Sequence, residues 1–451
     1  MKRFIIIFII ITLTSCSFDS KTGIWKDASN FPIENQDVIS IESGDSKNRY
    51  EEVFTRDFIY SEEKNPLLNS SFEMDTPFQI ENWLQKYGTE SNNISNFSYN
   101  GNKTLVSKSL KVKGLSGIRD ILFYNNNLIS YNRKGKIFVY SLLLKKRIYE
   151  YNFYKKKFKK INKNISFLIN EDVLYASDNL GYLYAIDLVK KSLIWAKNYG
   201  IPFRSNLKFV NQQLFVANQD NVLYSINTKT GEKNWQYATS GTFLKSDFKN
   251  NIALDKNTNT LLFYNTSGEL YSINYLSKKF NWVLNFKNSS SAGDTDLFIS
   301  NPVILKNNNM IISTEKAVLS YNLLSVSKNW SFPSDSILKP ILTTNYTYII
   351  SKKNFLICLE NKSGEVLWSK NIYKSLQDKK TKNLGNFIDI QIVNSELNLF
   401  TDAGYLLSFS SKNGNLDFIK KISKNGIKSE IFFSKNNFLL VDKKKRLLKF
   451  N

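Results

Sequence analysis

The side chains that could carry out catalysis are scarce in this sequence. The chain of 451 residues contains no histidine, which removes the Ser-His-Asp triad, Cys-His pairs and the usual zinc sites. Two pairs of carboxylates, Glu171-Asp172 and Asp294/Asp296, have the type that acid–base chemistry needs, but the sequence places no second pair opposite either of them. We therefore expect a non-enzymatic protein with no catalytic residues, no metal, no cofactor and no small-molecule substrate.

One of the two cysteines follows a short hydrophobic stretch at the N-terminus. Residues 1–3 are Met-Lys-Arg, residues 4–11 are apolar, and residues 13–16 read Leu-Thr-Ser-Cys. A basic start, a short apolar stretch and small residues before a cut site are typical of a secretory signal peptide. The apolar stretch is too short to span a bilayer permanently. The sequence thus predicts an exported protein.

Residues 13–16 resemble the lipobox of bacterial lipoproteins, in which a leucine and two small residues precede the acceptor cysteine. The resemblance implies a signal peptide over residues 1–15 and acyl chains such as palmitate on Cys16. Two or more acyl chains hold a protein firmly in a membrane. Ser17, rather than an aspartate, follows the cysteine, which favours the outer membrane. The alternative is an ordinary signal peptide with an incidental cysteine.

The composition fits a packed, strand-rich protein better than a nucleic-acid binder. Aromatic residues make up 14% of the chain and the formal net charge is +23. Aromatic enrichment favours strands. The lysines are scattered, and export removes most nucleic-acid partners, so we expect no nucleic acid despite the charge. Cys358 lies in the apolar stretch 355–359 without a second cysteine for a disulfide, and we expect a buried free thiol.

An internal repeat dominates the chain from about residue 130 onward. In each copy an apolar anchor residue in a short strand is followed, eleven positions later, by an aromatic residue. The pairs are Phe138 and Tyr149, Tyr184 and Trp195, Tyr224 and Trp235, Tyr271 and Trp282, Leu319 and Trp330, Ile357 and Trp368, and Leu407 and Phe418. The anchors are about 38 to 50 residues apart, the length of a four-stranded propeller blade.

A tight turn precedes nearly every anchor by three residues. Six copies have glycine or asparagine there, which tolerate the positive φ of a hairpin: Gly135, Gly181, Asn221, Gly268, Asn354 and Gly404. Lys316 departs from this preference. An eighth partial copy, with Leu448 as its anchor, ends the chain before an aromatic strand. Because an open ring would leave unpaired strand edges, we expect a strand near residues 103–112 to complete the last blade.

The conspicuous side chains of the repeat have a structural interpretation. A row of tryptophans could stack on a ligand, but we expect them to dock neighbouring blades through their large apolar surfaces. The Asp or Asn that closes each strand, such as Asp187, Asn227 and Asn274, could bind metal, but we expect these side chains to cap turns.

The region before the repeats is polar. Residues 17 to about 95 are rich in Ser, Asn, Asp and Glu, with a more apolar island at residues 65–85 and a possible short helix around residues 78–87. We therefore predict a signal peptide at 1–15, a lipidated tether and entry segment at 16–100, and an all-β, eight-bladed propeller of four-stranded blades at 101–451.

The repeat resembles the PQQ-like propeller repeat in residues 183–187 (Leu-Tyr-Ala-Ile-Asp), 230–235 (Thr-Gly-Glu-Lys-Asn-Trp) and 363–368 (Ser-Gly-Glu-Val-Leu-Trp). With a lipobox and eight blades, the chain resembles the BamB family, and residues 83–88 look like that family's entry segment. The resemblance implies a non-catalytic scaffold of the outer-membrane β-barrel assembly machine, on the periplasmic face of the outer membrane. Its expected partners are a POTRA domain of a BamA-like barrel subunit and other lipoproteins of that machine, and its expected role is to assist the insertion of barrel proteins.

Two neighbouring loops carry the BamA contact in that family. The first has a Leu-Arg pair, matched here by Leu244 and Lys245 after Phe243, although lysine cannot form the bidentate fork of arginine. The second is acidic and is matched by Asp294 and Asp296. The resemblance thus implies partner-binding roles for these five residues. The alternative is that both loops are ordinary solvated connections.

Two other functions remain open from the sequence. A propeller lipoprotein could serve another cell-envelope complex. A quinoprotein-type dehydrogenase shares the repeat, but such enzymes are usually longer and need a calcium site, a catalytic aspartate and often a vicinal disulfide. This chain has no adjacent cysteines.

Overall fold

The computed structural model describes residues 59–66, 71–103, 121–154, 158, 160–241, 248–287, 298–376, 384–434 and 437–451. It also describes three further strands, chiefly by their backbone. These three are β1 (Cys16–Asp19), β2 (Ile24–Asp27) and β3 (Leu105–Lys111). The chain divides into two compact units, Met1–Arg56 and Asp57–Asn451. In the first unit β1 and β2 pair antiparallel, with Cys16 opposite Asp27. The predicted signal peptide, residues 1–15, lies outside the described residues.

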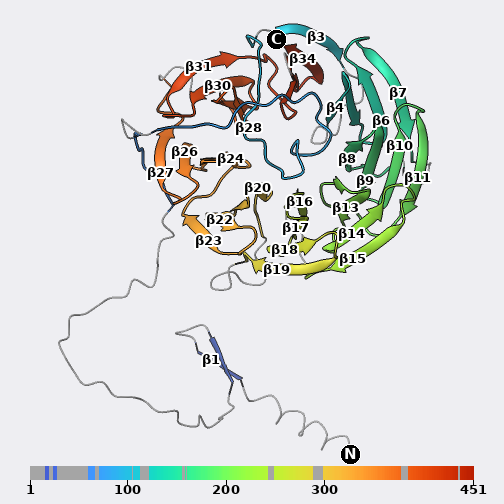
Figure 1. The fold of residues 1–451 in the computed structure, drawn as a ribbon, viewed down its shortest axis with the longest axis horizontal. Coiled ribbons are helices and arrows are strands. Elements are labelled where there is room, and N and C mark those ends of the chain that lie inside the picture. Colours follow the sequence, from blue (N-terminus) through green and yellow to red (C-terminus); the bar gives the residue numbers. More distant parts are fainter. Residues whose placement is uncertain are drawn as a thin grey trace, which may run out of the picture. The chain divides into compact units, whose positions relative to one another are not determined.

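The described part of the second unit forms eight four-stranded antiparallel sheets around a ring axis (Figure 1). In order from the axis outward, blade 1 is β4 (Leu122–Tyr124), β5 (Asn127–Tyr131), β6 (Lys136–Ser141) and β7 (Lys146–Asn152); blade 2 is β8 (Ile165–Asn170), β9 (Val173–Asp178), β10 (Tyr182–Asp187) and β11 (Ser192–Asn198); blade 3 is β12 (Lys208–Val210), β13 (Gln213–Ala217), β14 (Val222–Asn227) and β15 (Lys233–Ala238); blade 4 is β16 (Asn251–Asp255), β17 (Thr260–Tyr264), β18 (Glu269–Asn274) and β19 (Lys279–Asn285).

The second half of the ring repeats this order. Blade 5 is β20 (Ile304–Lys306), β21 (Asn309–Ser313), β22 (Val318–Asn322) and β23 (Lys328–Phe332); blade 6 is β24 (Ile341–Leu342), β25 (Tyr346–Ile350), β26 (Phe355–Glu360) and β27 (Val366–Asn371); blade 7 is β28 (Phe387–Val393), β29 (Glu396–Thr401), β30 (Tyr405–Ser410) and β31 (Leu416–Lys421); blade 8 is β32 (Phe432–Ser434), β33 (Asn437–Val441), β34 (Arg446–Phe450) and, outermost, β3. The predicted eight-bladed, all-β propeller is confirmed.

The ring closes by pairing the two ends of the propeller sequence. Strand β3 lies antiparallel to β34, with Leu105 opposite Phe450 and Lys108 opposite Leu448, and Figure 1 shows the two strands side by side. The prediction that a strand near residues 103–112 completes the last blade is therefore confirmed. The pairing satisfies the backbone groups of β34 that would otherwise form an open edge.

The turns before the anchors have the predicted conformation. At the six glycine or asparagine positions φ ranges from +59° at Asn221 to +97° at Gly404. In blade 8 Lys445 takes the same role with a φ of +62°. Blade 5, where Lys316 stands, instead uses a threonine: the Thr314 hydroxyl accepts a hydrogen bond of 3.2 Å from the Ala317 N–H.

The repeated tryptophans dock neighbouring blades, as predicted. The Trp195 indole N–H donates to the Thr228 carbonyl in the second turn of the next blade, at 2.8 Å. The ring covers Gly231 of that turn so closely that a Cβ there would lie 2.5 Å from it. The glycine of the Thr-Gly, Ser-Gly or Asn-Gly turn between the third and fourth strands packs directly on the tryptophan of the preceding blade. The same arrangement recurs at Trp330 with Asn361 and Gly364, and at Trp368 with Ser411 and Gly414.

The hydrophobic core lies between successive blades. Cys358 is fully buried on β26 within the cluster shared by blades 6 and 7 and carries a free thiol, as expected. The short helix expected around residues 78–87 is wrong: this stretch is extended, with Trp83 and Gln85 bridged to Phe123 and Leu168. Its backbone groups bond to the blades, which displaces the local helical pattern. Within the described residues no helix is long and apolar enough to cross a bilayer.

Candidate functional site: the hub, the central cavity and two neighbouring loops

Residues 71–99, the hub segment, lie over the centre of the ring and bond to the innermost strands (Figure 1). In blade 1 the Trp83 N–H donates to the Phe123 carbonyl at 2.7 Å, and the Phe123 N–H donates back at 3.1 Å. In blade 8 the Trp83 indole N–H donates to the Phe433 carbonyl at 2.8 Å. One residue thus joins the first blade to the last, beside the place where the ring closes.

The following residues reach the remaining blades in chain order. The carbonyls of four residues accept hydrogen bonds from the inner strands: Leu84 from Ile169 in blade 2, Thr89 from Lys208 in blade 3, Glu90 from Leu254 in blade 4 and Ser91 from Leu305 in blade 5. The Asn93 side chain both donates to and accepts from Leu342 in blade 6, and the Phe97 N–H donates to Ile392 in blade 7, so that the segment spans the whole circle. The entry segment is therefore part of the ring's framework, because it satisfies polar groups of all eight inner strands.

Asparagine side chains make the tightest of these connections. Asn92 is fully buried with φ +60°. Its amide N–H groups lie 3.1 Å from the Asn251 side-chain oxygen, 3.1 Å from the Ile252 carbonyl and 3.0 Å from the Val303 carbonyl. This one side chain links blades 4 and 5 to the hub segment.

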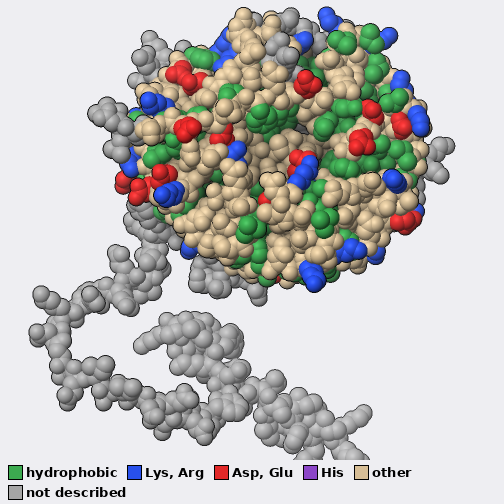
Figure 2. Space-filling model, in the orientation of Figure 1, with side chains coloured by type: hydrophobic (Ala, Val, Ile, Leu, Met, Phe, Trp, Pro, Cys, Tyr) green, Lys and Arg blue, Asp and Glu red, His purple; other side chains and the backbone are tan. Residues whose placement is uncertain are grey.

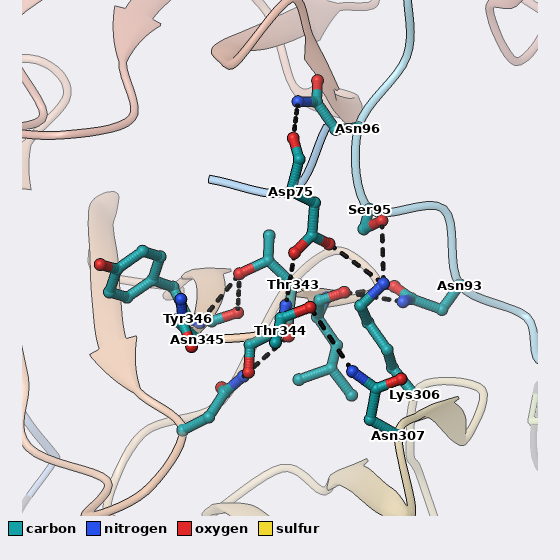
Figure 3. Close-up of polar contacts among 12 residues, drawn as sticks. Asp75, Asn93, Ser95, Asn96, Lys306, Asn307, Thr343, Thr344, Asn345 and Tyr346 are labelled. Carbon is teal, nitrogen blue, oxygen red and sulfur yellow. Dashed lines mark hydrogen bonds and ion pairs between the residues drawn. The ribbon is translucent and has the colours of Figure 1, made fainter. Parts of the chain in front are cut away.

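A second polar cluster fixes the start of the hub segment against blades 5 and 6 (Figure 3). The Asp75 carboxylate lies 3.1 Å from the Lys306 ammonium and accepts the Thr344 N–H at 2.9 Å. The Asn96 side chain donates to the Asp75 carbonyl at 2.7 Å. Burial alone would raise the pKa of Asp75, but the hydrogen bonds from Thr344 and Lys306 hold this pKa below its ordinary value.

A cavity of about 420 Å³ lies at the ring centre, with Trp83 and Phe97 of the hub segment in its wall. It holds charged groups: Lys86 and Glu430 form an ion pair, and Lys339 and Asp389 also line it. Burial, helped by Glu430, raises the pKa of Asp389 to about 7, and burial lowers the pKa of Lys339 to about 8. The cavity thus combines a largely apolar wall with charged side chains.

No metal cage is apparent around the cavity: the described residues contain no cluster of three or more His, Cys, Asp or Glu side chains able to hold a metal ion. On the face of the ring in Figure 2, basic and acidic side chains are interspersed rather than gathered in one patch. The basic run at residues 443–446 follows this pattern, since Lys443 pairs with Asp402 at 3.0 Å.

The five residues predicted to bind a partner lie outside the described residues. Phe243, Leu244 and Lys245 fall in the stretch 242–247, and Asp294 and Asp296 fall in the stretch 288–297. The structure does describe the residues on both sides of each stretch. It therefore fixes where the two loops leave the ring, although not where their side chains lie.

One aromatic cluster, the loop base, lies at the end of the first loop and at both ends of the second, and it consists of Phe248, Tyr264, Phe286 and Phe298. Phe248 ends the first loop and Phe298 ends the second, and their ring centroids are 5.5 Å apart. Both rings pack edge-on to the fully buried Tyr264, at 5.3 and 5.5 Å. The two loops thus leave adjacent blades from a shared rigid support.

Polar contacts fix the start of the first loop to blades 3 and 4. The Ser240 carbonyl accepts hydrogen bonds of 2.7 Å from both the Asn221 side chain and the Ser267 hydroxyl. Next to Ser267, Gly268 has φ +86°, and a Cβ there would lie 2.9 Å from the Phe298 ring. The glycine therefore serves both the hairpin turn and the packing of the loop base.

Exposed apolar side chains lie on the outer strands that lead into these loops. On β19 Phe280 and Val283 are 49% and 53% exposed. The Phe280 ring lies 4.4 Å from the ring of Tyr237 on the outer strand of the neighbouring blade. Exposed apolar groups of this kind are common at protein interfaces.

Comparison with known proteins agrees with this geometry. Residues 156–370 match a family model described as outer membrane protein assembly factor BamB. The crystal structure of BamB from Moraxella catarrhalis is similar with a TM-score of 0.61 and 14% identity, over 77% of this chain and 99% of that chain. The chain is a β-propeller that is similar to BamB.

Other solved structures resemble this BamB-like chain in fold alone. Quinohemoprotein alcohol dehydrogenase ADHIIG from Pseudomonas putida HK5 has a TM-score of 0.58 and 9% identity, over 80% of this chain and 75% of that chain. The computationally designed protein Ika8 has a TM-score of 0.57 and 10% identity, over 76% of this chain and 99% of that chain. A comparison of the sequence with curated proteins finds no match.

Sequence reasoning missed the hub contacts and the loop base. The run Asn92-Asn93 followed by Asn96 was a usable signal, since buried asparagines pair with backbone groups. The loop base had no such signal: Phe248, Tyr264 and Phe298 are far apart in the sequence and have no fixed place in the repeat.

Proposed function

We propose that this chain is a non-catalytic, lipid-anchored scaffold of the outer-membrane β-barrel assembly machine. In this proposal loops 242–247 and 288–297 bind a POTRA domain of a BamA-like barrel subunit, and the chain thereby assists the insertion of barrel proteins. The anchor is acylated Cys16, and the protein faces the periplasm.

The observation that carries the proposal is the shared loop base. Phe248 and Phe298 hold the ends of the two loops 5.5 Å apart, ring to ring, on adjacent blades. A single partner domain can therefore contact both loops at once, and the strand that leads into the second loop, β19, carries the exposed Phe280 and Val283. An apolar centre with a polar rim is the composition expected of a specific protein interface. The match of residues 156–370 to the BamB family model points to the same partner.

A quinoprotein-type dehydrogenase has only the fold in its favour. The similar dehydrogenase structures share 9% or less of their residues with this chain, and fold does not determine function. No arrangement of side chains in the cavity favours that reaction, so we do not propose it.

The proposal is tested by affinity purification of the tagged, lipidated chain from detergent-solubilised envelopes, with the captured proteins identified by mass spectrometry. We expect the BamA-like subunit and its companion lipoproteins in amounts comparable to the bait. Stoichiometric capture of a different envelope complex, without the barrel subunit, would refute the assembly role and leave the fold untouched.

The lipid anchor is tested separately by growing cells with labelled palmitate. The wild-type chain is expected to incorporate label, and the Cys16→Ser variant is expected to remain unlabelled and uncleaved. Equal labelling of both chains would show that Cys16 is not the acceptor.

A further inference from the structure

Residues 59–66, which lead from the tether toward the hub segment, lie against the outside of blade 6. In the sheet order β24–β25–β26–β27, strand β27 is outermost, and Lys64 forms an antiparallel bridge with Ser369 of that strand. The Lys64 N–H donates to the Ser369 carbonyl at 3.1 Å, and the Ser369 N–H donates to the Lys64 carbonyl at 2.9 Å. The segment thus pairs with the blade as a short fifth strand.

The Ser369 hydroxyl strengthens this pairing. It accepts the Lys64 N–H at 3.0 Å, contacts the Tyr60 hydroxyl at 3.0 Å and donates to the Glu62 carbonyl. Ser369 is fully buried although it lies on an outer strand. The bound segment is what covers it, since these contacts come from residues 60–64.

At both ends of the contact, residues of the segment bind specific groups beside β27. The Tyr60 N–H donates to the Pro333 carbonyl at 2.8 Å, and its ring lies 5.1 Å from the ring of Phe332 in the neighbouring blade. At the other end the Glu63 carboxylate accepts the Asn371 N–H at 3.1 Å and lies 3.5 Å from the Lys374 ammonium. The edge therefore has an aromatic platform, a central backbone pairing site and a basic end.

We propose that the outer edge of β27 is a strand-binding site, which residues 59–66 occupy in the closed state and which takes an extended polypeptide strand of a partner when they leave. The partner strand lies antiparallel to β27, with an aromatic side chain over Phe332 and an acidic side chain toward Lys374. This inference does not depend on the proposed role in barrel assembly, because it follows from the pairing at blade 6 alone.

The geometry of edge strands gives the physical reason. An outermost strand presents unpaired N–H and C=O groups that can template another strand, and strand addition gives affinity through the main chain and specificity through alternate side chains. Among the described residues, β27 is the outer strand that carries such a bridge. Because the occupying segment is covalently attached, its effective concentration is about millimolar. A free peptide therefore competes poorly until the pairing of the segment with β27 is weakened.

The test uses the full chain and a fluorescent peptide with the sequence of residues 57–68. The Lys64→Pro variant lacks the donor to the Ser369 carbonyl, so its own segment competes less well for the edge of β27. We therefore expect the peptide to bind this variant at least about tenfold more tightly than it binds the wild-type chain. Ser61→Pro is the matched control, since no hydrogen bond of the Ser61 N–H is among the contacts of the described segment, and it should bind the peptide as the wild type does. A peptide whose backbone nitrogen is methylated at the position of Lys64 cannot donate this hydrogen bond, and it is expected not to bind either chain.

Hydrogen exchange at the Ser369 amide provides the second measurement and does not require binding. The amide is expected to be protected in the wild type, to exchange faster in Lys64→Pro, and to regain protection when the unmodified peptide is added. Equal exchange in wild type and Lys64→Pro would refute the claim that residues 59–66 cover the outer edge of β27. Failure of the peptide to bind the released edge, or equal binding of the N-methylated peptide, would overturn the strand-binding site.

Discussion

Lys208 is a charged side chain buried between blade 3 and the hub segment. It is fully buried on β12, where its ammonium donates to the Gln85 side-chain oxygen at 3.1 Å and the Thr89 carbonyl at 2.6 Å. Burial lowers the pKa of Lys208 to about 7, because a charged group loses its hydration inside the protein. The same residue that holds the hub segment in blade 3 therefore makes stability depend on pH.

The sign of this dependence follows from the protons bound. In the unfolded chain a lysine titrates near about pH 10.4, so between about pH 7 and pH 10 the unfolded state binds more protons than the folded state. The free energy of unfolding should therefore rise with pH in this window, by at most about 1.4 kcal/mol per pH unit from this group. Urea unfolding from pH 6.5 to 9.5 should give a smaller slope for Lys208→Met than for wild type. Lys190→Met, at a lysine whose side chain is 80% exposed, is the control, and equal slopes for all three chains would refute the argument.

Gly268 tests the loop base at the scale of one residue. A Cβ there meets the Phe298 ring at 2.9 Å in a backbone with φ +86°, so we expect Gly268→Ala to cost about 1–3 kcal/mol. Gly241→Ala is the matched control, because nothing lies within 4 Å of a Cβ at that position, and it should change stability by less than about 0.5 kcal/mol. Thermal unfolding measures both. A neutral Gly268→Ala would mean that the packing around Phe298 is loose.

At the scale of elements, the hub segment is expected to stabilise the ring. Asn92→Gly keeps the backbone conformation but leaves the Ile252 and Val303 carbonyls, each now bonded to the Asn92 amide, without this donor. We expect a loss of about 2 kcal/mol or more in the free energy of unfolding. Ser91→Ala, which retains the carbonyl bonded to Leu305, should lose less. If Asn92→Gly unfolds at the same denaturant concentration as wild type, the hub segment adds nothing to the ring's stability.

The repeated elements were predictable from the sequence because the repeat has a fixed period. The turn at Gly404, the docking of Trp368 on the next blade and the closing strand β3 all follow from spacing and from the need to pair strand edges. A bulge between the third and fourth strands also recurs, for example between Ala185 and Ile186. Sequence reasoning did not see it, because it belongs to the pairing and leaves no mark in the residue types.

The elements without a period were not predictable. Residues 78–87 suggested a helix, but Trp83 and Gln85 pair with two different blades. The pairing of Lys64 with Ser369 joins residues 305 positions apart. Contacts of this kind depend on where the fold brings distant segments together, and no local pattern records them.

At the scale of the whole molecule, a closed ring with a hydrogen-bonded hub suits a rigid support for loops. Inner strands of all eight blades bond to the hub segment, and the loop base fixes two loops on adjacent blades. Functional loops on a rigid scaffold are the usual way in which a propeller presents a binding surface. The partner-binding role of Leu244, Lys245, Phe243, Asp294 and Asp296 stays a prediction.

The most direct test of that role is the binding of purified POTRA domains of the BamA-like subunit to the purified full chain, measured by calorimetry. We expect saturable binding by the wild type, at least about tenfold weaker binding by Leu244→Ala combined with Asp294→Ala, and wild-type binding by Lys362→Ala in the exposed turn of blade 6 as the control. Absence of binding by the wild type, or equal binding by the double variant, would contradict the account.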